Sequence, residues 1–261
     1  MYLENKEYPK SEGLYLVFAS SFAVLLVLTN IIGIKLFTAP FYSITSKLLF
    51  FIPQDSNGFA LTTGIITYPL TFLVTDIVSE IWGEKRANIM VFIGFGMSLL
   101  MLAIVQIALY TPPHMYWASP DNPFNYADST AYQNAFSSVF SVNGKLLFGS
   151  MLAYMTAQLL DVRLYHFWKN FTKGKHLWLR NNGSTMISQF VDTAIVNSIL
   201  FYWGFGWPFW QGVEVMLTIY FYKMMIAVID TPLIYLGVHL TKKQLQKWGE
   251  LPPENNLQEN I

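Results

Sequence analysis

Long runs of mostly apolar residues recur six times along the chain, at 14–37, 59–81, 89–110, 144–168, 184–206 and 212–240. A helix needs about twenty apolar residues to cross the hydrocarbon core of a bilayer, so each run is long enough to span a membrane. Charged residues make up only 12% of the 261 residues, about half the share found in soluble domains. The pattern predicts an all-α polytopic membrane protein with six transmembrane helices.

Polar segments at both ends divide the chain into three parts. Residues 1–13 are unlike a cleavable signal peptide, so we expect a cytoplasmic segment there. We expect one six-helix transmembrane domain over 14–242 and a cytoplasmic tail over 243–261. The long loop at 111–143 is rich in aromatic residues, and their four-residue spacing over 131–140 predicts a short helix lying in the membrane interface.

Basic residues are distributed unevenly about the six runs. One side of the membrane would hold the following residues: Lys6, Lys10, Lys85, Arg86, Lys169, Lys173, Lys175, Arg180, Lys242, Lys243 and Lys247. The other side would hold Lys47, with Lys145 at a helix boundary. Because cytoplasmic loops carry the excess of lysine and arginine, both termini are predicted to be cytoplasmic.

Two of the runs each carry a glutamine and an aspartate three residues apart. The fourth run contains Gln158 and Asp161, and the fifth contains Gln189 and Asp192. This spacing places both members of a pair on one helix face. An aspartate at the centre of a membrane helix costs roughly 2.5–3.5 kcal/mol on insertion scales. From the boundaries of the runs we expect the two pairs at nearly equal depth, in a functional site.

Further charged residues are predicted to converge on the cytoplasmic half of the bundle. Asp76 ends the second run, and Lys223 and Asp230 lie two turns apart in the sixth, where they could neutralise each other. Arg163 follows Asp161 closely and could either neutralise it or extend its charged end to the membrane surface. Glu80 is most simply a residue at headgroup level. Pro69 and Pro232 are expected to kink the second and sixth spans.

Side chains of this kind suit two sorts of ligand. Carboxylates accept paired N–H donors, and a glutamine amide both donates and accepts. Together with nearby aromatic faces, these groups suit a flat polar heterocycle such as a guanine-like base. They would equally suit a proton or cation relay through the membrane. The chemistry of the residues leaves both interpretations open.

Four separated motifs, in order, resemble those of the queuosine precursor transporters, also called the vitamin uptake transporter family. They are the run from Tyr68 to Asp76, Gln158-x-x-Asp161, Ser184-Thr185 leading to Gln189-x-x-Asp192, and Lys223. The resemblance covers about residues 14–242. It implies a bacterial inner-membrane importer with six helices that moves 7-deazaguanine bases inward for tRNA modification. The implied substrates are 7-cyano-7-deazaguanine, 7-aminomethyl-7-deazaguanine and queuine.

The resemblance also implies a substrate site. The positions that match the family's polar residues are Asp76, Gln158, Asp161, Asp192, Thr193 and Lys223. Gln189 stands where another family member has asparagine, and Asp230 joins the candidate set through its depth in the sixth run. No metal site or cofactor is expected, apart from coupling to H⁺ or Na⁺ in a secondary transporter.

Other functions remain as alternatives or are excluded. The substrate-binding subunit of an energy-coupling-factor type ABC importer is also a small six-helix bundle, and Ala19-x-x-x-Ala23 could dock it to a partner. Small residues in the third run would permit a homodimer. The chain has no cysteine and lacks hydrolase and P-loop motifs, so an enzyme is not expected. Topology explains the basic loop at 169–183, so nucleic-acid binding has no support.

Overall fold

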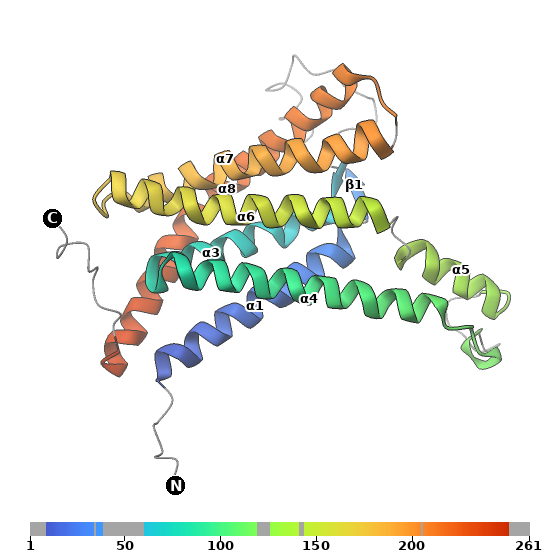
Figure 1. The fold of residues 1–261 in the computed structure, drawn as a ribbon, viewed down its shortest axis with the longest axis horizontal. Helices are drawn as coiled ribbons and strands as arrows, with labels where there is room; N and C mark the ends of the chain where they lie inside the picture. The colour runs from blue at the N-terminus through green and yellow to red at the C-terminus, as the bar shows by residue number, and fades with distance from the viewer. Residues whose placement is uncertain are drawn as a thin grey trace, which may run out of the picture.

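The computed structural model of this protein describes residues 9–33, 35–38, 60–118, 126–140, 144–204 and 206–250. These residues are almost entirely helical (Figure 1). The α-helices are α1 (Lys10–Ile32), α3 (Tyr68–Trp82), α4 (Glu84–Tyr110), α5 (Ser129–Phe140), α6 (Gly144–Phe171), α7 (Leu177–Asn197) and α8 (Phe209–Trp248). The shorter elements are the 3₁₀ turns η1 (Thr63–Ile66) and η2 (Met115–Ala118), and η3 (Ser198–Gly204), a π-helical continuation of α7.

Helix α3 is the centre of the bundle. It packs against α1, α4, α6 and α8, while α1–α4, α4–α6, α6–α7 and α7–α8 pack side by side around it. Two apolar clusters hold it in place. One joins α3 to α1, α4 and α6 around Phe22, Val78 and Met90. The other joins it to α6, α7 and α8 around Tyr165 and Ile234. A side chain on α3 can therefore reach any of these neighbours.

Several helix ends meet at one end of the bundle. The Glu250 carboxylate accepts hydrogen bonds from the backbone N–H groups of Lys10 and Ser11, at 3.1 and 2.7 Å, so the end of α8 lies against the start of α1. Tyr15 of α1 donates to the carbonyl of Arg86 at the start of α4. Helix α5 lies at the opposite end, away from both termini (Figure 1). This arrangement requires an even number of long helices to run between the two ends.

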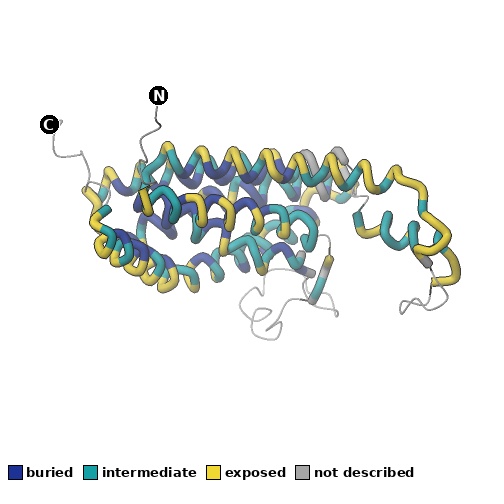
Figure 2. Tube along the Cα trace, turned by 90° about the horizontal axis from the view of Figure 1, so that it is seen from below, coloured by how far each residue is buried: buried dark blue, intermediate teal, exposed yellow. Residues whose placement is uncertain are grey.

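Most exposed side chains on the long helices are apolar. Helix α4 presents Phe92, Met97, Ile104 and Ile107 outward, and Figure 2 shows exposed positions along its outer face. Large apolar patches of this kind mark a surface that contacts something other than water. Among the described residues, four segments are long and apolar enough to cross a membrane: Lys10–Ile32, Thr63–Trp82, Glu84–Tyr110 and Phe209–Trp248.

Helix α7 has its polar face inside the protein. Its buried residues are Leu177 and the polar set Arg180, Asn181, Asn182, Ser184, Thr185, Ser188, Gln189, Asp192, Thr193 and Asn197. Its exposed large side chains are apolar: Trp178, Ile187 and Phe190. A helix in a water-soluble protein has the opposite arrangement. The polar interior explains why α7 is less hydrophobic overall than the four segments above.

Several predicted element boundaries are wrong. The fifth run was predicted to start at 184, but α7 begins at Leu177, so Arg180 belongs to a helix and not to a loop. The sixth helix extends to Trp248, which makes the first part of the predicted tail helical. At the start of the chain, residues 10–13 are already helical, because α1 begins at Lys10.

A short pair of strands changes the predicted end of the first span and the predicted start of the second. Strand β1 (Leu36–Thr38) pairs antiparallel with β2 (Ala60–Thr62), with Leu36 opposite Thr62. The first span therefore ends at Ile32 and not at 37, and the second is helical only from Thr63. Helix α5 agrees with the short helix expected over 131–140. Lys6 and Lys47 lie outside the described residues.

Small residues on α4 are used mainly inside the chain. A Cβ atom added at Gly94 would approach the buried ring of Phe22 on α1 to 2.5 Å, so the two helices depend on the missing side chain. Ser98 accepts a hydrogen bond from Asn30 of α1 at 3.2 Å. Gly96 has no atom within 4 Å of such a Cβ. Two of the three small residues that would permit a homodimer, Gly94 and Ser98, thus contact α1 within the same chain.

The two prolines differ in position. Pro69 lies in the first turn of α3, where its missing N–H is not needed for the helix. It therefore starts α3 and does not kink it, contrary to the prediction. Pro232 lies inside α8, where it removes one intrahelical hydrogen bond.

Candidate functional site

One stripe of α3 carries the features that define the candidate site. Tyr68, Phe72, Asp76 and Glu80 follow each other at four-residue intervals, so they share one face of the helix. Each step along the stripe is about 6 Å, given a rise of 1.5 Å per residue. Tyr68 and Phe72 line a cleft, Asp76 faces a second buried acid, and Glu80 joins a group of cations.

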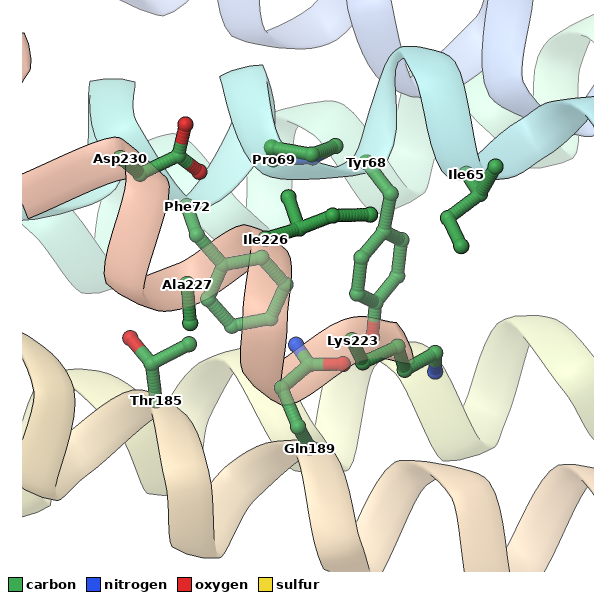
Figure 3. Close-up of a pocket in the computed structure, with 10 residues that line it drawn as sticks. All are labelled: Ile65, Tyr68, Pro69, Phe72, Thr185, Gln189, Lys223, Ile226, Ala227 and Asp230. Carbon is green, nitrogen blue, oxygen red and sulfur yellow. The ribbon is translucent and has the colours of Figure 1, made fainter. Parts of the chain in front are cut away.

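The cleft lies between α3, α7 and α8. It is lined by Ile65, Tyr68, Pro69, Phe72, Thr185, Gln189, Lys223, Ile226, Ala227 and Asp230. In Figure 3 the aromatic rings of Tyr68 and Phe72 form one wall, with Lys223 and Asp230 at opposite ends. The cleft is narrow and has room for on the order of one water molecule. A larger ligand would require the helices to separate.

An ion pair joins α7 to α8 beside the cleft. The Lys223 ammonium donates to Asp192 Oδ2 at 2.6 Å, and the Tyr68 hydroxyl donates to the same oxygen at 2.8 Å. The Lys223 ammonium also lies 4.5 Å from the centre of the Tyr68 ring, within the range of a cation–π contact. Asp192 Oδ1 has no hydrogen-bond partner among the described residues. It is therefore a buried acceptor that a ligand could use.

Gln189 is buried, and no described residue forms a hydrogen bond of good geometry with it. It is 2% exposed, and neither its amide nitrogen nor its amide oxygen has a partner of good geometry in the part of the chain that the structure describes. Its side chain points into the cleft in Figure 3. Leaving a buried donor or acceptor unpaired costs about 1–3 kcal/mol. A ligand with a donor and an acceptor side by side would satisfy both groups.

Asp76 and Asp161 form a second polar site, one turn away from the cleft along α3. Both are fully buried. Among the charged groups near Asp76, Asp161 has the strongest electrostatic interaction with it. Asp161 Oδ1 accepts a hydrogen bond from Ser188 at 2.9 Å. Asp161 Oδ2 and both Asp76 oxygens have no partner of good geometry among the described residues. The two acids face each other, and neither lines the cleft.

Gln158 has a different environment from Gln189, although both belong to a Gln-x-x-Asp pair. Its amide nitrogen donates to the Tyr154 hydroxyl at 2.8 Å, and its oxygen accepts from Thr75 at 3.2 Å. Tyr154 in turn donates to Thr71 at 2.6 Å. Because both ends of the amide are bonded inside the protein, Gln158 ties α6 to α3 and does not reach the cleft.

Glu80 ties four helices together. Its carboxylate lies 3.2 Å from Lys169 of α6, 3.3 Å from Arg180 of α7 and 3.9 Å from Lys242 of α8. The Tyr165 hydroxyl donates to it at 3.1 Å. The predicted headgroup-level position of Glu80 does not account for these ion pairs, which give the residue a structural role. Sequence reasoning missed this cluster, because three of its members lie in segments that it treated as loop or boundary.

The predicted site residues come together only in part. Gln189, Lys223 and Asp230 line the cleft, and Asp192 bonds to Lys223. The sequence left open that Lys223 and Asp230 neutralise each other. In the structure Lys223 forms its ion pair with Asp192 instead. Thr193 is buried beside Asp192 and its hydroxyl is unpaired among the described residues, but it does not line the cleft.

The contacts between α6 and α7 agree with the expectation that the two Gln-x-x-Asp pairs lie at nearly equal depth. Asp161 accepts a hydrogen bond from Ser188, which directly precedes Gln189 on α7. Because the two helices run antiparallel, Gln158 then lies close to the level of Asp192, so the pairs overlap in depth and only the two aspartates are offset by about one turn. Arg163 is exposed and lies two residues from Asp161, on another side of α6, so it does not neutralise that acid. Tyr68 was not expected in the site, although its hydroxyl reaches Asp192.

These features define a class of protein. Apolar outer faces and membrane-length helices mark a multi-pass membrane protein. A cleft with unpaired buried polar groups between its helices is typical of a membrane protein that binds a polar solute at membrane depth.

Comparison with known proteins gives the family. The model of the family described as "Putative vitamin uptake transporter" matches residues 62–237, and the chain belongs to this family. A Bacillus subtilis (strain 168) protein named "Probable queuosine precursor transporter" is 29% identical over 179 residues, which is 68% of this chain and 72% of that protein. No solved structure matches the chain at a significant level.

Two further relatives cover more of the chain. A Haemophilus influenzae protein with the same name is 24% identical over 216 residues, 81% of this chain and 83% of the relative. The Escherichia coli (strain K12) "Queuosine precursor transporter" is 24% identical over 211 residues, 79% of this chain and 86% of the relative. The family match at residues 62–237 runs from before α3 into α8 and includes the residues that line the cleft.

Proposed function

We propose that this protein imports queuosine precursors across the bacterial inner membrane as a secondary transporter, for use in tRNA modification. The observation that carries the proposal is the inward polar face of α7, whose Gln189 and Asp192 present unpaired groups at or beside the cleft. Membership of the family and the names of three relatives support it. We propose transport, not catalysis.

The cleft matches the chemistry of a 7-deazaguanine base. Such a base presents adjacent N–H donors and a carbonyl on one edge, which would pair with the free Asp192 oxygen and the Gln189 amide. Its flat ring would stack against Tyr68 or Phe72. Asp230, at the far end of the cleft from Lys223, would pair with the cationic aminomethyl group of 7-aminomethyl-7-deazaguanine (Figure 3). We propose 7-cyano-7-deazaguanine and queuine as further substrates.

The narrow cleft fits a transporter that changes conformation. It has room for about one water molecule, so a base can enter only after α3, α7 and α8 separate. Alternating access uses such movements of helices about a central site. Glu80 and its cations would close one side, which we propose is cytoplasmic.

We propose six membrane spans with both termini in the cytoplasm. The helix ends that meet near Glu250 and Lys10 also carry most of the described lysines and arginines, including Lys85, Lys169 and Lys242. The positive-inside rule places such an end in the cytoplasm. Helices α6 and α7 would then be the fourth and fifth spans, kept in the bilayer by their apolar outer faces.

The proposed docking motif does not support the alternative that this protein is the substrate-binding subunit of an energy-coupling-factor importer. Ala19 and Ala23 are 5% and 8% exposed and lie in the interior of the bundle. They are therefore not available at the surface of this conformation. Uptake by the chain expressed alone would separate the two functions.

The experiment uses a bacterium that cannot make queuosine precursors. Cells expressing the chain are fed each candidate base at low concentration, and queuosine in tRNA is measured. We expect the wild type to restore queuosine, and Gln189→Leu to abolish it at equal membrane abundance. Gln106→Leu, the same change on α4 away from the cleft, should leave uptake intact. Failure of the wild type with every base would contradict the proposed function.

A further inference from the structure

The acid pair Asp76 and Asp161 lies outside the cleft, and no lysine or arginine of the described residues forms an ion pair with it. Neither residue belongs to an ion pair in the described part of the chain, and both are fully buried. The nearby charged groups that act most strongly on Asp76 are all acids: Asp161 on α6, Asp230 on α8 and Glu80 on α3 itself. Two buried cations of α6 and α7, Lys169 and Arg180, are paired with Glu80.

Two adjacent buried carboxylates cannot both carry a charge at low cost, because each disfavours the charged form of the other. A proton shared between them removes one charge and supplies the missing hydrogen bond. The unpaired oxygens are in the right place for this, since Asp161 Oδ2 and both Asp76 oxygens lack a partner among the described residues.

The surroundings distinguish the two acids. Asp161 receives a hydrogen bond from Ser188, and the hydroxyls of Ser184 and Thr185 on α7 also act on it. Hydroxyl donors stabilise the charged form of a carboxylate. Asp76 has no such donor with good geometry, and its other titratable neighbour on α6 is Tyr165, which donates to Glu80. A proton shared by the pair would therefore lie on Asp76 and bridge to Asp161 Oδ2.

From this geometry we propose that Asp76 and Asp161 form a proton-binding site, separate from the substrate cleft, that couples import to a proton gradient. The proposal rests on the proposed function. It would remove both acids from the predicted substrate contacts. Thr185 links the two sites, because it lines the cleft and acts on Asp161. Phe72 connects them on α3, one turn from Asp76 and in the cleft wall.

The pair also joins three moving parts. Asp76 is on α3, Asp161 is on α6, and its hydroxyl partner Ser188 is on α7. Loss of the shared proton would leave two like charges facing each other and would push α3 away from the α6–α7 hairpin. Because α3 and α7 both line the cleft, that movement would change its width. Protonation and substrate access are coupled in this way without direct contact.

The test uses the full-length protein in liposomes with radiolabelled 7-aminomethyl-7-deazaguanine. An acidic exterior should drive wild-type accumulation above the external concentration, and a pH dye inside the vesicles should report acidification as substrate enters. Asp76→Asn and Asp161→Asn should each lower gradient-driven accumulation at least tenfold. Both should retain exchange of external label for preloaded substrate. Glu84→Gln, an acid change in the first turn of α4, should behave as wild type.

The possible results separate the coupling site from the transport function. Wild-type uptake that is driven by a sodium gradient, or that causes no internal acidification, would overturn the proton site and leave the transporter intact. Accumulation that survives both substitutions would overturn the assignment to this pair. Loss of exchange together with accumulation in well-inserted variants would show that the acids hold substrate or structure. No wild-type uptake of any base would contradict the proposed function as well.

Discussion

Gln189 and Gln158 occupy equivalent positions in their motifs but have opposite surroundings. Gln158 has a donor and an acceptor bonded within the bundle, while Gln189 has neither among the described residues. The sequence pattern could place both on helix faces, because that depends only on spacing. It could not show which one is left unpaired, because this depends on Thr75 of α3 reaching Gln158, in addition to Tyr154 one turn before it on α6.

Replacing Gln189 by leucine should not destabilise the protein. The change removes two unpaired buried polar atoms, whose desolvation costs about 1–3 kcal/mol each, and fills a similar volume. We expect the melting temperature in detergent to stay constant or rise, although uptake is lost. A fall of several degrees would show that Gln189 has a structural partner.

Asp230 should control which substrates are preferred. Asp230→Asn removes the negative charge at one end of the cleft. Uptake of 7-aminomethyl-7-deazaguanine should fall by about tenfold relative to the uncharged 7-cyano compound, which corresponds to about 1.4 kcal/mol. Competition uptake with both bases measures the ratio directly. Equal losses for both bases would place Asp230 against their shared ring and not the amine.

At the scale of helices, the sequence predicted most elements but not where they end. The apolar runs alone predicted that α1, α4 and α8 are helices. The start of α7 was missed because Arg180, Asn181 and Asn182 look like a solvated loop, yet they are buried on its polar inner face. Strand β2 was missed because its pairing with β1 is a tertiary contact.

The stability of the protein should depend strongly on Glu80, the one acid among the described residues that pairs with Lys169, Arg180 and Lys242. Glu80→Gln would leave the buried cations Lys169 and Arg180 without a counter-charge, and breaking a buried pair typically costs about 3–5 kcal/mol. Lys242→Ala removes a cation that is 44% exposed and 3.9 Å away, so it should cost less than about 1 kcal/mol. Thermal unfolding in detergent compares the two. Similar melting temperatures would mean that water screens the whole cluster.

The contact between α1 and α4 offers a matched pair of substitutions. Gly94→Ala would force the buried Phe22 ring to move, and overpacking of this kind costs about 1–3 kcal/mol. Gly96→Ala meets no atom and should be neutral or stabilising by up to about 1 kcal/mol, because alanine favours a helix. Melting temperatures of the two variants should therefore move in opposite directions. If both fall equally, α4 has a further contact at Gly96, such as a second copy of the chain.

At the scale of the whole molecule, Glu250 joins the two ends of the described chain. Hydrogen bonds from the backbone N–H of Ser11 and then Lys10 hold the pKa of Glu250 below its ordinary value of 4.5. Because the pKa is lowered in the folded protein, the charged carboxylate stabilises the folded state at pH values above the ordinary pKa of 4.5. This contribution is lost as the pH falls through the lowered pKa.

The pH dependence of this contact can be isolated with Glu250→Gln. The wild type should melt slightly higher than the variant at pH 6–7, and the difference should shrink as the pH drops below 4.5. Melting curves of both proteins across this range give the difference. A difference that grows on acidification would have the wrong sign for this carboxylate.

The inward polar face of α7 also has a consequence for biogenesis. During synthesis, α7 emerges before α8, so Asp192 exists for a time without Lys223. Its isolated segment is too polar to partition into lipid readily, and its unpaired groups need protein neighbours. We therefore expect the insertion machinery to retain α6 and α7 until α8 arrives, and a ribosome stalled before Lys223 to leave this hairpin accessible to quality-control proteases.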